Sequence, residues 1–514
     1  MPSEPARSRP NAGAHAAPSV MTDDPAARTD EGTTHQSVER LWGTVVSGGY
    51  CVGCGVCTGG EADAPLAIQM DPAGMYQAVR NSGARAGAGP VLTEDVCPFS
   101  ESSVSEDRLA SELFGNCQEH PLIGRYSSCY AGFVGDAGVR AQGSSGGLGT
   151  WLVLELFRKR LIDGAIHVRP LENGGDQPRL FAYALSSTEA QIRAGAKSRY
   201  YPVELSHILA VIRQRPGRYA VVGVPCFVKG LRLLCRQDPI IRERLVFFVG
   251  LFCGHLKSTA FAAFQAWQCG VRPDGLRMID FRKKLPGRPA DRYGVEVVGQ
   301  ISDHWETRVA AVADLYGSDW GLGFFKYKAC DYCDDVTAET ADVAVGDAWL
   351  SQYTPDGGGT NVVVARSALA QEILDDGRAK GLIVMHQVPA DTVARSQDAG
   401  LRHRRFGLAY RLYRDEAAHR WHPPKRVAAS ASHLNAHTRR IQDLRVAIAR
   451  ESHIAWQAAL RRDLRAFFLL MDGLVAAYAL CQQAARRKRG PGRIQSIVLR
   501  VGRRIQREIE RHWR

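Results

Sequence analysis

Three cysteines within seven residues constrain this chain more than any other feature of its sequence. They stand in the run Cys51-Val-Gly-Cys54-Gly-Val-Cys57. Two residues separate neighbouring thiols, and the intervening glycines allow a tight loop that offers three thiolates to one metal centre. A fourth cysteine, Cys97, stands before Pro98 after a gap of 39 residues. Three closely spaced cysteines with a distant Cys-Pro are typical of a 4Fe–4S cluster.

Zinc is the main alternative at these cysteines, because zinc also binds thiolates. Structural zinc sites usually take their ligands from paired Cys-x-x-Cys hairpins, whereas this run has three cysteines in a row. We therefore predict a 4Fe–4S cluster whose ligands are Cys51, Cys54, Cys57 and Cys97.

A second set of four cysteines is spread more widely along the chain. Cys226 and Cys253 each stand at the end of an apolar run that predicts a strand, where a side chain can emerge at the edge of a sheet. Cys330 and Cys333 form a pair that supplies two ligands from one hairpin. Four thiolates are enough for a second cluster. The alternative, on spacing alone, is that Cys226 and Cys253 are buried structural thiols, as cysteines often are.

The rest of the sequence favours a cytoplasmic, reducing setting. Thirteen cysteines in 514 residues are unlike a secreted disulfide framework, which is expected in a shorter and denser chain. Residues 1–40 lack the apolar core of a signal peptide, and their composition predicts a disordered leader. No apolar run reaches the roughly 18 residues of a spanning helix, since the nearest candidate, 466–481, carries Asp472. The five isolated cysteines are expected to be core or surface thiols: Cys117, Cys129, Cys235, Cys269 and Cys481.

Strands and helices alternate from about Tyr126 to Tyr413, which predicts an α/β fold. Hydrophobic periodicity predicts helices over 146–160 and 258–269, the second beginning at Ser258 as its N-cap. Apolar runs bounded by Gly, Pro or charge predict strands over 164–168, 219–224 and 245–252.

Several short segments, taken in order, resemble a known family. They are Gly143-Ser-Ser-Gly-Gly147, Ile162-Asp-Gly-Ala-Ile166, Lys197-Ser-Arg-Tyr200, Gly223-Val-Pro-Cys226, Ile279-Asp-Phe-Arg-Lys283 and Gly346-Asp-Ala-Trp349. With the cysteine run, they resemble the beta subunits of coenzyme F420 (deazaflavin) hydrogenases and dehydrogenases. They are also similar to the plant 7-hydroxymethyl chlorophyll a reductases. The resemblance covers roughly residues 50–366, and it implies two 4Fe–4S clusters and a bound FAD.

Composition and periodicity along the chain, read with this resemblance, give a division of the chain. Residues 41–125 are expected to form a ferredoxin-like iron–sulfur module, and residues 126–414 an α/β domain that binds FAD and the second cluster. Residues 415–514 are expected to form a basic, helical C-terminal extension.

Two segments are expected to hold the FAD. Gly143, Ser144, Ser145, Gly146 and Gly147 precede a predicted helix, where free backbone N–H groups suit the pyrophosphate. Without the resemblance, they are a flexible turn and helix cap.

The second segment is Lys197, Ser198, Arg199 and Tyr200, which offers charge and hydroxyl groups; its alternative is a solvated basic loop. Arg282 and Lys283 are expected to face an anionic substrate or to end a surface strand. Asp347 is expected to contact the flavin or a cluster-bearing loop, or to serve as a turn residue. His255, beside Cys253, is a weak candidate acid for which packing is the commoner role.

The C-terminal tail carries most of the excess charge. Residues 486–514 hold eleven Lys/Arg against two acids, which is +9 of the formal +13. Arginines alternate with Ile and Val over 494–509, which predicts a basic amphipathic helix that docks on an acidic protein or an anionic membrane surface. The alternative is a solvated arginine face on a packed helix. Nucleic acid is not expected, because no base-reading motif accompanies the charge.

The first hypothesis for function is an oxidoreductase that relays electrons between a one-electron donor such as ferredoxin and an unknown small-molecule substrate. The clusters would exchange single electrons, and FAD would exchange pairs with the substrate. Two alternatives stay open: a metal-stabilised scaffold that recruits partners through its basic tail, and a membrane-surface enzyme of polysaccharide synthesis.

Overall fold

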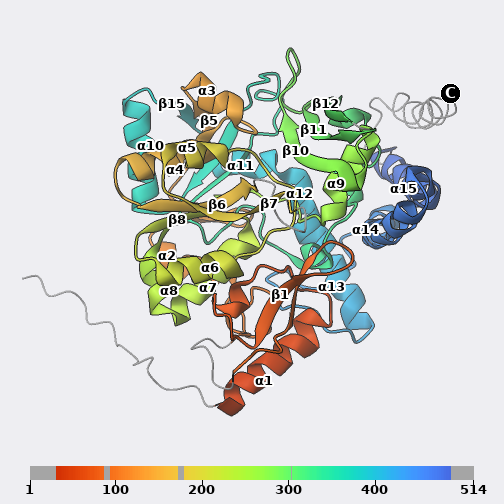
Figure 1. Ribbon diagram of the computed structural model, residues 1–514, viewed down its shortest axis with the longest axis horizontal. Coiled ribbons are helices and arrows are strands. Elements are labelled where there is room, and N and C mark those ends of the chain that lie inside the picture. Colours follow the sequence, from red (N-terminus) through yellow and green to blue (C-terminus); the bar gives the residue numbers. More distant parts are fainter. Residues whose placement is uncertain (1–30, 86–92, 172–178, 303, 488–514) are drawn as a thin grey trace, which may run out of the picture.

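The computed structural model describes residues 31–85, 93–171, 179–302 and 304–487 (Figure 1). At its centre lies an eight-stranded mixed sheet with the order β15-β5-β14-β13-β9-β8-β6-β7. The four central strands β13, β9, β8 and β6 run parallel, and antiparallel strands flank them on both sides. The strands are β5 (Ser128–Val134), β6 (Gly164–Pro170), β7 (Phe181–Ser186), β8 (Tyr219–Gly223), β9 (Leu245–Leu251), β13 (Val343–Asp347), β14 (Asn361–Ala365) and β15 (Ile383–Gln387).

The central strands are almost wholly apolar because helices cover the sheet on both faces. In β9, Phe247 and Val249 pack beneath one helical layer, while Phe248 faces the opposite layer. One layer comprises α3 (Ala137–Gln142), α4 (Leu148–Arg158), α5 (Glu189–Ala194) and α10 (Ala368–Ala379). The other comprises α6 (Ser206–Gln214), α7 (Pro225–Gln237) and α8 (Pro239–Arg244), with α11 (Ala390–Ser396) and α12 (Asp398–Arg402) farther along. Figure 1 shows α4 and α7 on opposite sides of the sheet.

The N-terminal segment shares a core with α6 and α7. Val45, Val52 and Val56 are buried in the same apolar cluster as Ile208 of α6 and Leu231 of α7. Its regular elements are α1 (Glu31–Leu41), β1 (Leu66–Met70), β2 (Tyr76–Arg80) and α2 (Glu106–Phe114), followed by the hairpin β3 (Gln118–His120) and β4 (Gly124–Tyr126). The cysteine run is therefore held against the helices of the central sheet.

A second sheet and a helical hairpin complete the structure. The antiparallel strands β10 (Leu276–Lys283), β11 (Gly294–Ile301) and β12 (His304–Ala311) form the sheet. It shares an apolar cluster with α9 (Thr259–Gln268) and with the hairpin of α14 (Ala436–Arg461) and α15 (Leu464–Arg487). Helix α13 (Leu408–Ala417) runs across residue 415, where the C-terminal extension is expected to begin.

The mixed α/β architecture and the helical C-terminal part confirm the predicted fold class at that level. The helix expected over 146–160 is α4, and the one over 258–269 is α9, which does have Ser258 at its N-cap. The three predicted strands are β6, β8 and β9.

Two expectations are corrected. Helix α1 occupies Glu31–Leu41, inside the expected leader, because Val38 and Leu41 bury their side chains. The apolar stretch in α15 is also longer than expected. Its residues Leu464–Ala485 are long and apolar enough to span a membrane by length and composition only, with a mean hydropathy of 1.7 and 28% of that window buried in the protein. The basic helix predicted over 494–509 lies outside the described residues.

The buried His167 of β6 generates a pH prediction. Its Nε2 lies 2.8 Å from Ser186 Oγ, and burial, followed by the charge of Arg169, lowers the pKa of the imidazole to about 4. An unfolded histidine titrates near 6.5, so the unfolded chain binds the extra proton between these values. The free energy of unfolding should therefore fall as pH decreases from about 6.5 to about 4.

Replacing His167 with glutamine should flatten that decrease, measured by urea unfolding across the same pH window. Above pH 7 the two proteins should respond to pH alike, since neither carries a charge at this position. Equal acid slopes for both proteins would contradict the prediction.

Candidate functional site

The first cysteine set lies on a loop that only glycine can shape. Gly53 and Gly55 have φ of +62° and +83°, and a Cβ on Gly53 would lie 2.2 Å from the carbonyl oxygen of Tyr76. The loop is tied to the start of α6 because the Leu205 N–H donates to the Cys54 carbonyl at 2.8 Å. The glycines that suggested a tight loop in the sequence therefore do position Cys51, Cys54 and Cys57 on it.

Cys97 joins these three thiols. Burial raises the pKa of Cys57 well above its usual value, and the thiols of Cys54, Cys51 and Cys97 raise it further. Burial, opposed by backbone hydrogen bonds, raises the pKa of Cys97 to about 12. The four predicted ligands thus form one electrostatically coupled group of thiols, of which Cys54 is buried and the other three are partly buried.

The second set is assembled from three elements. Cys226 lies in the first turn of α7, Cys253 follows β9, and Cys330 and Cys333 lie in and just after a 3-10 helix, Lys328–Tyr332. Burial raises the pKa of Cys226 well above its usual value, with further contributions from Cys333, Cys253 and Cys330. Cys54 adds to the same shift. The two sets are therefore neighbours, and Cys54 and Cys226 interact electrostatically across them.

Among the described residues, no group of three or more His, Cys, Asp or Glu side chains is arranged to hold a single metal ion. The two cysteine sets stay predicted ligands of clusters, in which each sulfur would bind a different iron.

The five isolated cysteines lie elsewhere. Cys129 and Cys235 are buried, on β5 and α7, as expected for core thiols. Cys117 donates a hydrogen bond to the Arg366 carbonyl, and Cys269 and Cys481 pack at the edge of the cluster around α9 and α15.

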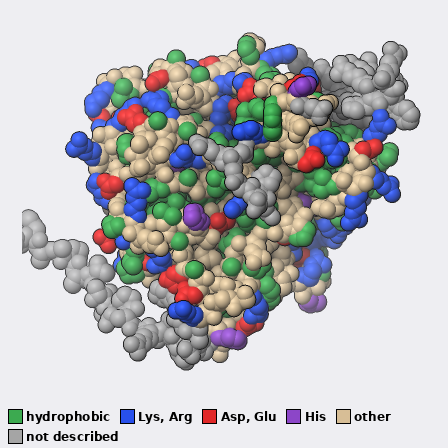
Figure 2. Space-filling view, in the orientation of Figure 1, with side chains coloured by type: hydrophobic (Ala, Val, Ile, Leu, Met, Phe, Trp, Pro, Cys, Tyr) green, Lys and Arg blue, Asp and Glu red, His purple; other side chains and the backbone are tan. Residues whose placement is uncertain are grey.

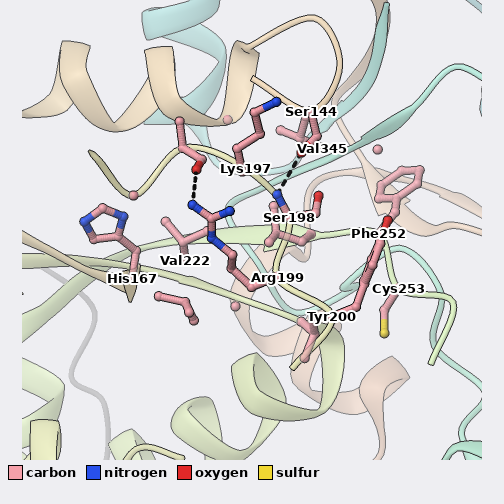
Figure 3. Close-up of a pocket in the computed structure, with 18 of the residues that line it drawn as sticks. Ser144, His167, Lys197, Ser198, Arg199, Tyr200, Val222, Phe252, Cys253 and Val345 are labelled. Atoms are coloured by element: carbon pink, nitrogen blue, oxygen red, sulfur yellow. Dashed lines mark hydrogen bonds between the residues drawn. The ribbon is translucent and has the colours of Figure 1, made fainter. Parts of the chain in front are cut away.

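A cavity of about 260 Å³, measured as space for the centres of water-sized spheres, opens at the carboxyl ends of the parallel strands (Figure 3). All the residues predicted to bind FAD line it except Gly146. Cys253 also lines it, so one end of the cavity reaches the second cysteine set.

The glycine-serine loop and the 197–200 segment meet across this cavity. The Ser198 N–H donates to Ser144 Oγ at 2.7 Å, a contact drawn in Figure 3. Gly147 is the N-cap of α4, with φ of +83°, and a Cβ there would lie 2.8 Å from Val134. The first amide of the helix, at Leu148, donates to Asn361 Oδ1. Among the described residues, the amides of 144–147 have no assigned acceptor, which leaves them to a ligand.

The 197–200 segment is held in a strained conformation. Lys197 has φ of +95°, which a non-glycine residue rarely adopts, and its Nζ lies 3.0 Å from Asp280 Oδ2. The Arg199 guanidinium lies over the Phe181 ring, and its Nε is buried with no partner. Burial lowers the pKa of Arg199 to about 10. This segment is fixed by packing, contrary to the solvated-loop alternative.

Arg282 is buried, contrary to the expectation of a surface strand end. It is 3% exposed, and its Nη1 lies 2.9 Å from Asp347 Oδ2 and 3.3 Å from the Tyr200 hydroxyl. Its Nη2 donates to the Ser144 carbonyl at 3.3 Å. Arg282 therefore braces both cavity-lining segments, and Asp347 serves as its counter-charge.

Several residues at the site carried no signal in the sequence. Lys284 donates to the carbonyls of Arg140, Ser145 and Gly358, and burial, together with nearby cations, lowers its pKa to about 8. Trp320 lies with its ring centroid 4.5 Å from that of His255, whose Nε2 is buried without a partner. No periodicity or motif points to either position.

Arg404 is the most deeply buried of these residues. It lies in a short π-helix, His403–Gly407, and is 2% exposed. Burial alone would lower the pKa of its guanidinium, but the thiols of Cys333, Cys253 and Cys330 outweigh burial and raise it. A single arginine among helical residues gives no indication in the sequence that it will reach a cysteine set.

Arg282 and its neighbour Lys283 provide a matched pair of variants. Arg282→Met leaves the Asp347 carboxylate without its partner inside the protein, which should lower the free energy of unfolding by about 3 kcal/mol. Lys283→Met removes a partly exposed pair with Glu296 and should cost less than about 1 kcal/mol. Urea unfolding of the three proteins checks both values, and equal losses would show that Arg282 is no brace.

Comparisons with known proteins identify the family to which this chain belongs. Residues 129–210 match the N-terminal region of the family described as coenzyme F420 hydrogenase/dehydrogenase, beta subunit, and residues 217–391 match the C-terminal region of the same family. The matched regions begin after the first cysteine set and end before Arg404.

Individual relatives are distant. Coenzyme F420 hydrogenase subunit beta of Methanococcus voltae is 21% identical over 303 residues, which cover 56% of this chain and 98% of that protein. Coenzyme F420-dependent sulfite reductase of Methanocaldococcus jannaschii is 21% identical over 344 residues, 64% of this chain and 46% of that protein. A chain of the F420-reducing hydrogenase complex from Methanosarcina barkeri is covered completely at 16% identity, over 62% of this chain, with a TM-score of 0.44. The two matched family regions together span half of this chain, which belongs to the coenzyme F420 hydrogenase/dehydrogenase beta-subunit family.

Proposed function

We propose that this chain is an iron–sulfur flavoprotein oxidoreductase that relays electrons between a one-electron donor and a two-electron substrate. The observation that carries the proposal is continuity: the cavity that contains the predicted FAD residues extends to Cys253, and the set of Cys253 is coupled to the first set. Cavity, second set and first set therefore form a line of neighbouring sites. The family membership and the relatives' names, a hydrogenase subunit and a sulfite reductase, support an oxidoreductase.

The residues fit an FAD at the cavity. The amides of the 143–147 loop offer an anion cradle, and the buried cations of Lys197 and Arg199 lie opposite it. Tyr183 lines the cavity and lies near enough to Cys226 and Cys54 for both thiols, after burial, to raise its pKa. When bound, FAD supplies hydride or paired-electron chemistry, and 4Fe–4S clusters supply single-electron transfer.

This chain's own residues would position the groups and exclude water. Arg282 holds Ser144, Tyr200 and Asp347 together, so the cradle and the opposite wall keep one spacing. The rings of Phe252, Tyr200 and Trp320 line the cavity together with His255 and Lys257, which follow Cys253 in the chain. The rings limit water near a reactive electron carrier. Ferredoxin, or a similar small iron–sulfur protein, remains the proposed donor, and the substrate is proposed only as a small molecule.

The alternative of a non-catalytic scaffold predicts a different cavity. Lys197 has a positive φ, and buried nitrogens of Arg199 and His255, which line the cavity, lack hydrogen-bond partners. A non-catalytic scaffold gives no reason for these unfavourable features. These features are typical of a site that completes its hydrogen bonds with a ligand.

Cofactor counting tests the proposal. After anaerobic purification we expect about eight irons, eight sulfides and one FAD per chain, with visible absorption from both. Cys330→Ser should reduce the iron content by about half, because one cluster loses a ligand. Cys235→Ser, a buried thiol outside both sets, should leave the count unchanged. Zinc without flavin would overturn the enzyme proposal, and four irons in the parent protein would remove the second cluster.

A membrane-surface location has its own observation, independent of the predicted tail helix. Leu469, Leu470 and Leu480 of α15 are 79%, 55% and 63% exposed. Between Arg465 and Arg486 the helix has one charged residue, Asp472, which is turned inward to the Tyr316 hydroxyl at 2.8 Å. The exposed positions 465, 469, 473, 476 and 480 recur every three or four residues, so they form one stripe.

Cations border this stripe. Arg461 and Arg462 are exposed at the turn between α14 and α15, and Figure 2 shows Lys and Arg along the edge where Figure 1 places the hairpin. An apolar stripe bordered by cations complements an anionic lipid surface. We therefore propose that the α14–α15 hairpin rests on anionic bilayers.

Vesicle flotation tests this location. The protein should float with vesicles that contain phosphatidylglycerol and much less with pure phosphatidylcholine. Leu469→Glu with Leu470→Glu should weaken flotation more than about tenfold, since burying one leucine contributes over 1.4 kcal/mol. Val384→Glu, at a 54% exposed position on β15, serves as the control and should not change it. Unchanged flotation of the leucine variant, or none by the parent protein, would remove the membrane proposal.

A further inference from the structure

Arg404 is a buried cation that, like Arg366 and Lys257, has backbone carbonyl groups as its hydrogen-bond acceptors. Its Nη1 donates to the Asp335 carbonyl at 3.0 Å, and its Nη2 donates to the carbonyls of Cys253 and Gly254 at 2.9 and 2.7 Å. Its Nε is buried with no partner. Within the described part of the chain, the guanidinium forms no ion pair with a carboxylate.

The nearest carboxyl group is engaged elsewhere. Asp335 Oδ1 accepts from the Thr337 N–H, and its Oδ2 accepts from the Glu339 N–H, both at 2.9 Å. Asp331, on the other side, is paired with Lys326 and His403. Carbonyl groups accept hydrogen bonds from both Nη atoms of Arg404, whereas Asp335 raises the pKa of the guanidinium without forming an ion pair with it.

An uncompensated charge inside a protein is strongly unfavourable. The groups that surround Arg404, apart from these carbonyls, include three thiols of the second set, Cys253, Cys330 and Cys333. Thiolates that bind iron carry negative charge, and so does the centre that they form with it. The chain therefore places a fixed cation beside the position at which the proposed function requires an anionic centre.

We propose that Arg404 is the counter-charge of the second 4Fe–4S centre and favours its reduced state. This inference rests on the proposed function, because it requires a centre at Cys226, Cys253, Cys330 and Cys333. One-electron reduction by the donor adds one negative charge to that centre. A buried cation stabilises the more negative form, so Arg404 acts as a positioning residue that raises the midpoint potential.

Arg366 provides a matched control. It is 2% exposed, and its guanidinium donates to the carbonyls of Arg125, Ala338, Ile123 and Thr337. Its neighbouring thiols, Cys129 and Cys117, belong to neither set. Arg366 therefore shares the burial and the carbonyl contacts of Arg404 without the proposed centre.

The experiment is a redox titration of the anaerobically purified protein, followed by electron paramagnetic resonance, with iron counted in every sample. Arg404→Gln keeps donors and removes the charge, whereas Arg404→Lys keeps the charge. We expect Arg404→Gln to lower one of the two midpoint potentials. At a fixed applied potential, the ratio of reduced to oxidised centre should fall at least tenfold, which corresponds to a shift of about 59 mV for one electron. Arg404→Lys should shift it less, and Arg366→Gln should shift neither.

Each outcome decides the inference. The inference is overturned if Arg404→Gln keeps eight irons and neither midpoint potential moves. It is also overturned if Arg404→Lys or Arg366→Gln shifts a midpoint potential as far as Arg404→Gln does. If Arg404→Gln loses four irons and Arg404→Lys keeps eight, the charge is needed to hold the centre, which supports the inference. Loss of iron in both variants indicates a role of shape alone and overturns it. Four irons in the parent protein disprove the second cluster itself, and the iron count separates that failure from the others.

Discussion

The site depends on one geometric constraint, which is that neighbouring parallel strands all end at the same edge of a sheet. Strands β8, β9 and β13 are parallel neighbours, so the residues that follow or end them, Cys226, Cys253 and Asp347, gather at one edge. Ligands in open α/β sheets bind at this edge. The cavity, the second cysteine set and the Arg282–Asp347 pair are three consequences of the same strand order.

The buried charges differ between the two sides of this sheet edge, the side near α4 and the side near α7. Toward α4, cations meet backbone amides and carbonyls, and Asp347 balances Arg282. Toward α7 and the 330–333 segment, burial raises the pKa of every predicted thiol ligand. Arg404 adds a positive charge beside these thiols. The two ends of the cavity thus each place cations beside a proposed anion, a phosphate group of FAD at one end and an anionic thiolate centre at the other.

Much of this could be predicted from the sequence, for identifiable reasons. The glycines between Cys51, Cys54 and Cys57 predict a loop with positive φ, and the apolar runs before Cys226 and Cys253 predict strands that end together. The burial of Arg282 could not be predicted, because a basic residue after an apolar pair looks the same at a surface and in a core. Arg404 could not be predicted either, since its contacts join residues 150 positions apart in the sequence. The folding of α1 was equally hidden, because among its described side chains, 35–41, those in the shared apolar core are Val38 and Leu41.

The shared core of the N-terminal segment and α6–α7 has a kinetic consequence. Val56 lies within van der Waals reach of Gly230, since a Cβ on that glycine would be 3.2 Å from Val56 Cγ2, and Pro98 adjoins the same point. The two cysteine sets are therefore carried by a single packed body with no linker between them. Electron carriers on tethered domains must wait for the domains to meet. Electron carriers at these positions would have a constant separation. The difference between their midpoint potentials, and not a movement of domains, would then control the rate of electron transfer between them.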